Sequence, residues 1–89
     1  MAIFVVSYDL NKNKNYDKII SALEASDSCK VLLSLWLINY NGSVEQLHTE
    51  LIKLVDEDDS VFICQTPKIS IVSFNIANAY EFQEWLDRH

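Results

Sequence analysis

The stretch AIFVVSY, residues 2–8, decides the fold because it consists almost wholly of β-branched, aromatic and aliphatic residues. Such residues favour a β-strand. Alternate side chains of a strand point to opposite faces of a sheet, and here both sets are apolar. A strand that is apolar on both sides belongs inside a sheet whose two faces are covered. The stretch therefore predicts a central strand with a layer packed on each side.

The next part of the chain changes from a helical to a strand-like pattern. Asn15 is a helix-capping residue, and the apolar residues after it recur at spacings of three and four, which predicts a helix that ends near residues 26–28. They are Tyr16, Ile19, Ile20 and Leu23. Residues 29–40 favour β structure again. They form either one bent strand or two strands joined by a turn near Ser34.

The second half opens with the strongest helix signal in the sequence. Ser43 and Gln46 have the spacing of a capping box, and apolar residues then keep to one face as far as Val55. The helix is expected to end at the acidic run 56–59, because carboxylates oppose the negative end of a helix dipole.

Strands are then predicted over residues 60–66 and 69–76, followed by a short helix that Asn78 caps. The order β-α-β-β-α-β with a C-terminal strand and helix favours an α+β sandwich of the ferredoxin-like type. Residues 1–89 then form a single domain.

One sheet face of this sandwich needs a cover from elsewhere. The two long helices occupy the other face, yet residues 31–38 are apolar on both sides, as residues 2–8 are. A second copy of the sheet, or residues 67–89 of a partner copy, would supply the cover. The sequence therefore predicts a homodimer with residues 67–89 at its interface.

Charge is distributed unevenly along the chain. The net charge is −6; residues 1–40 hold four bases and four acids, whereas residues 41–89 hold three bases and nine acids. Phosphate binding depends on Lys and Arg, so only the first half is a candidate for contact with nucleic acid. The acidic second half is a candidate surface for a protein partner.

Two further features concern the compartment. The apolar run 31–38 is too short to cross a bilayer, and no membrane association is expected. Cys29 and Cys64 have no clustered Cys or His beside them, which indicates buried thiols of a cytoplasmic protein and not a zinc site.

Several short motifs come in an order that one protein family shares. A strand ends in Tyr8-Asp9, the segment VLLSLW follows at residues 31–36, and the acidic run 56–59 leads into Ser60-Val61. In this order and spacing, residues 1–66 resemble the small CRISPR-associated adaptation subunit. They are still more similar to its SinR-like relatives, and the VapD ribonucleases are more distant.

The resemblance implies a ferredoxin-like homodimer in which the two copies of Asp9 approach across the twofold axis. In family members with nuclease activity, this pair holds a divalent cation that activates water against a phosphodiester. Asp9 is thus the expected catalytic residue and metal ligand, with Tyr8 and Ser34 supporting it. Mg²⁺ is the expected ion, since it prefers oxygen ligands and keeps several waters.

Two departures from the family bear on activity. Where the family carries several arginines after the aspartate, this chain has Lys12, Lys14 and Lys18, which are the expected contacts to nucleic acid; its one arginine is Arg88. Bidentate phosphate binding by arginine is therefore missing. An apolar run, residues 36–38, also replaces a polar stretch of the family, and DNA integration is not expected.

These features are compatible with several functions. The first is an adaptation-subunit-like dimer with weak or vestigial Mg²⁺-dependent endonuclease activity on RNA or DNA in antiviral defence. The alternatives are a non-catalytic dimeric scaffold or inhibitor linked to a defence system or mobile element, plain nucleic-acid binding, and a VapD-like ribonuclease toxin. The acidic run 56–59 is interpreted as a solvated loop, because it lacks the Asp-x-Asp-x-Asp-Gly spacing of a calcium loop.

Overall fold

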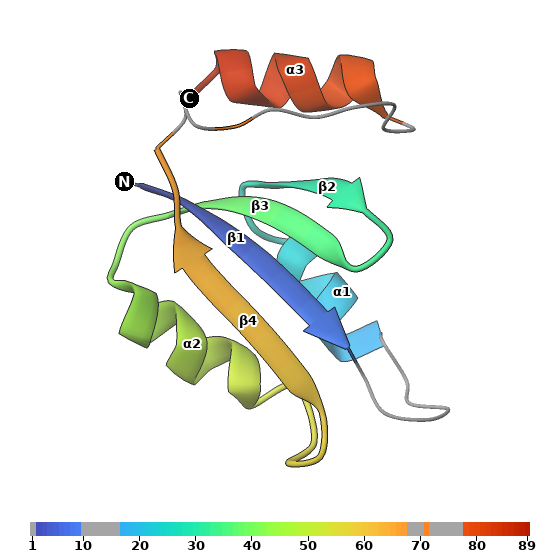
Figure 1. Cartoon of the computed structure of the whole chain (residues 1–89), viewed down its shortest axis with the longest axis vertical. Coiled ribbons are helices and arrows are strands. Elements are labelled where there is room, and N and C mark those ends of the chain that lie inside the picture. The colour runs from blue at the N-terminus through green and yellow to red at the C-terminus, as the bar shows by residue number, and fades with distance from the viewer. Residues whose placement is uncertain (1, 10–16, 68–70, 72–77) are drawn as a thin grey trace.

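The computed structural model describes residues 2–9, 17–67, 71 and 78–89. Their helices and strands form a small α+β fold with a four-stranded antiparallel sheet, which is compatible with the predicted ferredoxin-like sandwich (Figure 1). The elements are β1 (Ala2–Asp9), α1 (Asp17–Glu24), β2 (Ser28–Leu32), β3 (Leu35–Tyr40), α2 (Val44–Ile52), β4 (Ser60–Gln65) and α3 (Ala79–Asp87).

The sheet has the order β2-β3-β1-β4, so β1 lies inside it as its sequence predicts. Val6 of β1 is opposite Trp36 of β3 on one side and Ile63 of β4 on the other. Residues 29–40, for which the sequence allows one bent strand or two strands, belong to a hairpin. Its turn lies at residues 33–34, between β2 and β3.

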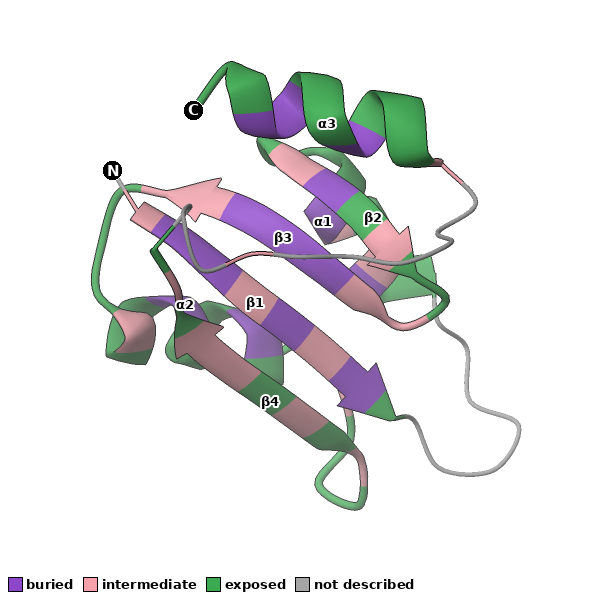
Figure 2. Ribbon diagram, turned by 45° about the horizontal axis from the view of Figure 1, so that its top comes forward, coloured by how far each residue is buried: buried purple, intermediate pink, exposed green. Residues whose placement is uncertain are grey.

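Each face of the sheet carries its own apolar core. On one face, α1 and α2 pack on the even-numbered side chains of β1, such as the fully buried Phe4. On the other face, α3 packs on Ile3, Cys29 and Leu37. Figure 2 shows that the buried positions run along β1 and β3, whereas β4 has none. Both faces of the two inner strands are therefore covered over part of their length.

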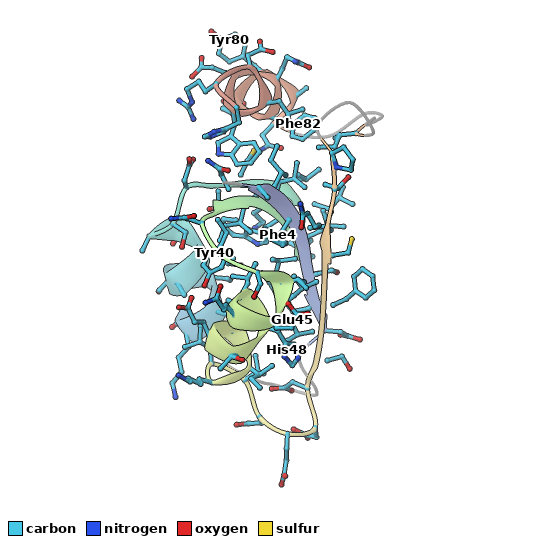
Figure 3. The ribbon with its side chains drawn as sticks, turned by 90° about the vertical axis from the view of Figure 1, so that its left-hand side faces the viewer. Phe4, Tyr40, Glu45, His48, Tyr80 and Phe82 are labelled. Atoms are coloured by element: carbon cyan, nitrogen blue, oxygen red, sulfur yellow. The ribbon has the colours of Figure 1, made fainter. Side chains whose placement is uncertain are left out.

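The last helix contacts the sheet of its own chain. Phe82, Trp85 and Leu86 are its buried residues, and Figure 3 shows Phe82 directed toward the sheet and Tyr80 away from it. Asn78 occupies the predicted N-cap position of α3, but its side chain makes no capping hydrogen bond. Its side-chain amide donates to the Lys30 carbonyl at 2.5 Å instead, so it ties the start of α3 to β2.

The capping box at the start of α2 is confirmed. The Ser43 hydroxyl accepts from the Gln46 backbone N–H at 3.1 Å, and the Gln46 side chain accepts from the Ser43 N–H at 2.7 Å. The helix ends at Ile52, about one turn before the predicted end at Val55, where the chain turns into the acidic run.

Some expectations remain predictions. Two predicted features lie wholly or almost wholly outside the described residues: the cap at Asn15 and the strand over 69–76. A single chain does not test the homodimer or the interface role of residues 67–89. Both cysteines are free, with Cys29 buried and Cys64 half-buried. Across the described part of the chain, none of the helices has the length and apolarity that crossing a membrane requires.

Candidate functional site

The residue expected to bind metal lies at the C-terminal end of the central strand. Asp9 is the last residue of β1, is exposed, and pairs with Ser60, the first residue of β4. Because Ser60 directly follows the acidic run 56–59, strand pairing brings Asp9 and this run to the same end of the sheet (Figure 1).

Tyr8 and Ser34 lie where they fix the end of β1. Tyr8 is buried on the α1 and α2 side of the sheet, and Trp36 donates its indole N–H to the Tyr8 hydroxyl at 3.2 Å. The Tyr8 backbone N–H donates to the Ser34 carbonyl at 3.1 Å. Ser34 occupies the turn between β2 and β3, which is one of the two predicted alternatives, and the contact is made by its backbone. Trp36 is a supporting residue that the sequence did not single out.

The three lysines expected to contact nucleic acid are described only in part. Lys12 and Lys14 lie outside the described residues, whereas Lys18 is exposed in the first turn of α1. A basic surface next to Asp9 therefore stays a prediction.

The acidic run forms a compact cluster of ligand atoms. Asp56, Asp58 and Asp59 each offer a carboxylate oxygen, and these oxygens all lie within 4.8 Å of one another. The Asp59 carboxylate accepts from the Asp56 N–H at 2.8 Å, and the Asp59 N–H donates to the Asp56 carbonyl at 3.0 Å, so the loop is a closed turn. Oxygen ligands of this kind suit hard cations such as Mg²⁺ or Ca²⁺.

This cluster could hold a metal ion, but its chemistry does not select one. The family resemblance predicts the ion at Asp9, whereas the spacing of residues 56–59 predicts a solvated loop. Among the described residues, the group of three possible ligand atoms comes instead from Asp56, Asp58 and Asp59. Asp9 does not belong to this group.

A second polar cluster joins α3 to the rest of the chain. The Asp27 carboxylate accepts from the Trp85 indole N–H at 2.9 Å and from an Asn39 amide N–H at 3.3 Å. The His89 Nε2 lies 3.0 Å from the same carboxylate, and the His89 ring packs on Trp85 at 4.7 Å between centroids. Burial raises the Asp27 pKa, but these hydrogen bonds and the charge of His89 outweigh it and hold the pKa below its usual value. The cluster secures α3, and no motif in the sequence indicated it.

Comparison of the chain with protein-family models, with curated proteins and with solved structures finds no match. The geometry defines a small α+β protein with an antiparallel sheet. Carboxylates gather at one end of its strands.

Proposed function

We propose that this protein is an adaptation-subunit-like homodimer that contacts nucleic acid and has weak or vestigial Mg²⁺-dependent nuclease chemistry at paired Asp9 residues. The observation that carries the proposal is the position of Asp9. It is an exposed carboxylate at the end of the central strand, and three further carboxylates cluster at the same end of the sheet.

The sheet face on the Asp9 side supports a twofold arrangement. Side-chain alternation places Asp9 on the same face as Ser7, whose neighbours across the sheet are Leu35 and Phe62. Phe62 is 62% exposed, because α3 covers the part of this face near Ile3. A second copy packed over this row would cover Phe62 and bring the two Asp9 residues toward each other.

The residues present fit weak rather than efficient chemistry. A divalent cation, when bound, supplies an activated water and neutralises phosphate charge. Two Asp9 carboxylates are enough to hold such an ion with substrate phosphate. Tyr8 and Trp36 hold the backbone at the end of the strand that carries Asp9. The net charge of −6 opposes the approach of a polyanion, so affinity for nucleic acid and turnover are both low.

Cleavage assays test this proposal. Wild-type protein, Asp9→Asn and the matched control Glu24→Gln, an exposed carboxylate at the end of α1, are incubated with labelled single-stranded RNA and double-stranded DNA, with Mg²⁺ or with EDTA. Slow, EDTA-sensitive cleavage by wild type and Glu24→Gln, lost in Asp9→Asn, is the expected result. Intact substrates with the wild type, or cleavage that persists in Asp9→Asn, contradict the nuclease proposal.

A non-catalytic interaction scaffold is the second candidate. The excess of acids over bases in residues 41–89 favours it, since such a surface suits a basic protein better than a phosphate backbone. A VapD-like ribonuclease toxin would differ from both candidates by cutting RNA alone.

A further inference from the structure

The inference concerns the link between β3 and α2, which consists of Asn41, Gly42 and Ser43. Gly42 is the one glycine of the chain, so Asn41 is the one asparagine that glycine follows. All three residues are exposed. Tyr40, the last residue of β3, is held by pairing with β1, and Ser43 is held by the capping box of α2. The asparagine and the glycine therefore join two anchored positions.

The two residues of this link have the groups that a ring closure needs. The Cγ atom of an asparagine can reach the backbone nitrogen of the next residue and close a five-membered ring with it. A side chain on that next residue hinders the approach, and glycine has none. Within the described ranges, the Gly42 N–H donates no hydrogen bond, and Asn41 is open to solvent. Both groups are therefore available for reaction in contact with water.

Close packing explains why residue 42 is a glycine. A Cβ atom here would lie 2.6 Å from the Tyr40 ring and 2.7 Å from the Gln46 Oε1, whereas carbon atoms in contact lie about 3.5–4.0 Å apart. The Tyr40 ring packs edge-on against Phe4 of the core, and the Gln46 oxygen accepts the Ser43 N–H of the capping box. The packing that fixes this link thus also retains the reactive asparagine–glycine pair.

The other two described asparagines lack these features. Asn39 lies within β3, its amide donates to the Asp27 carboxylate at 3.3 Å, and a tyrosine follows it. The Asn78 amide donates to the Lys30 carbonyl at 2.5 Å, and an alanine follows it. Both amides are engaged and both following residues carry a side chain, so these two asparagines are internal controls.

We propose that Asn41 is a site of spontaneous deamidation by water, and that its isoaspartyl product loosens the start of α2. The Gly42 nitrogen gives up its proton and bonds to the Asn41 Cγ. The bond from Cγ to the amide nitrogen breaks, ammonia leaves with that proton, and a succinimide ring remains. Water then opens the ring at either carbonyl. Opening at Cγ gives aspartate and opening at the backbone carbonyl gives isoaspartate, and neither step needs an oxidant or a reductant.

The two products differ in the main chain. Aspartate leaves the backbone unchanged and adds a negative charge on the N-terminal side of α2, which the helix dipole favours. Isoaspartate directs the main chain through the Cβ atom, so it lengthens the link between Tyr40 and Ser43 by one methylene. Because both residues are anchored, the added length displaces Ser43 from Gln46. The first turn of α2 then loses the two hydrogen bonds of its capping box.

This inference goes beyond the nuclease proposal and depends on neither Asp9 nor a homodimer. It also gives the folded chain a property that changes with its age, since each step needs only water. The part of the fold affected is α2, which places Leu47 and Leu51 in the core.

Ageing of the purified full chain tests the site. The protein is kept at physiological temperature and pH in H₂¹⁸O and is then digested with trypsin, which releases residues 31–53 as one peptide. Mass spectrometry locates the product, and the heavy oxygen separates it from product formed during digestion. We expect Asn41 to lose its amide at least tenfold faster than Asn39 in the same peptide. Isoaspartyl methyltransferase should methylate aged wild type but not aged Asn41→Gln.

Hydrogen exchange separates the effects of the two products. The aspartyl and isoaspartyl forms are isolated by chromatography, and exchange is measured at Gln46 and Leu47. Their N–H groups donate to the Ser43 hydroxyl and carbonyl, each at 3.1 Å. We expect both amides to exchange about fivefold faster in the isoaspartyl form, the factor that corresponds to the loss of a helix cap. The aspartyl form and freshly purified Asn41→Asp should exchange like fresh wild type.

Three results would overturn the inference. Loss of the Asn41 amide that is no faster than loss of the Asn39 amide removes the site. A product that is aspartate alone, or an isoaspartyl form whose Gln46 and Leu47 amides exchange as in fresh protein, removes the effect on α2. Equal acceleration of exchange in aged wild type and aged Asn41→Gln assigns the change to another residue.

Discussion

The hydrogen bond between Trp36 and Tyr8 offers a quantitative test of how the end of β1 is held. Trp36→Phe removes the indole N–H that lies 3.2 Å from the Tyr8 hydroxyl, in a site where both side chains are almost fully buried. A buried polar group that loses its partner costs about 1–3 kcal/mol. Tyr8 has a further interaction, so we expect the lost bond to account for about 1–2 kcal/mol of the drop in the free energy of unfolding, to which the loss of buried ring volume adds.

A double-mutant cycle isolates the bond from the loss of ring volume. Trp36→Phe, Tyr8→Phe and the double variant are unfolded with urea, and the interaction energy between the two sites is taken from the four free energies. We expect a coupling of about 1 kcal/mol, the usual contribution of such a bond. A coupling within about 0.3 kcal/mol of zero would refute the reasoning, because the two residues would then act independently.

Three further predictions concern the cap, the α3 contact and the open sheet face. Ser43→Ala should lower the free energy of unfolding by about 1 kcal/mol in a urea titration, because α2 loses its capping box; an unchanged midpoint would contradict this. Asp27 has a lowered pKa when folded, so its contribution to stability is present above the ordinary carboxylate value of about 4 and is lost as the pH falls through the folded value. The stability difference between wild type and Asp27→Asn should therefore shrink on acidification, and a difference that is constant from pH 7 to pH 2.5 would exclude the ionised Asp27 carboxylate as its source. Phe62→Glu should convert a dimer to a monomer in sedimentation equilibrium, while Tyr80→Glu, at a residue 75% exposed on α3, should not; equal effects would show that Phe62 is not at the interface.

The sequence predicted those elements whose causes are local. The capping box needs only two residues three apart, and the central position of β1 follows from its two apolar faces. The hairpin at residues 28–40 stayed ambiguous because its turn, Leu33-Ser34, contains no Gly, Pro, Asn or Asp.

Contacts between distant segments could not be predicted in the same way. Asn78 has the residue type of a cap, yet its amide bonds to Lys30, 48 positions away. The polar cluster at α3 forms only because α3 packs on its own sheet, a placement that no local pattern specifies. Its members are Asp27, Asn39, Trp85 and His89.

The candidate site also combines a residue chosen from the sequence with contacts that depend on the tertiary structure. Asp9 was selected through a family resemblance; it lies exposed at the end of β1, and its role stays a prediction. Its proximity to residues 56–59 depends on the β1–β4 register, which pairs Asp9 with Ser60. The grouping of three carboxylate oxygens depends on the turn that Asp56 and Asp59 close, and sequence spacing alone gave no sign of it.

Disulfide trapping tests most directly whether Asp9 meets its counterpart in a second copy. Asp9→Cys is combined with Cys64→Ser, because Cys64 is a half-buried free thiol, and the control combines Asp87→Cys on α3 with the same change. A disulfide forms only when the two Cα atoms come within about 7 Å. Paired Asp9 residues predict a covalent, reductant-sensitive dimer under mild oxidation at low micromolar concentration, with no such dimer in the control. If Asp9→Cys gives no more covalent dimer than Asp87→Cys, the two Asp9 residues do not meet and the account of the site is wrong.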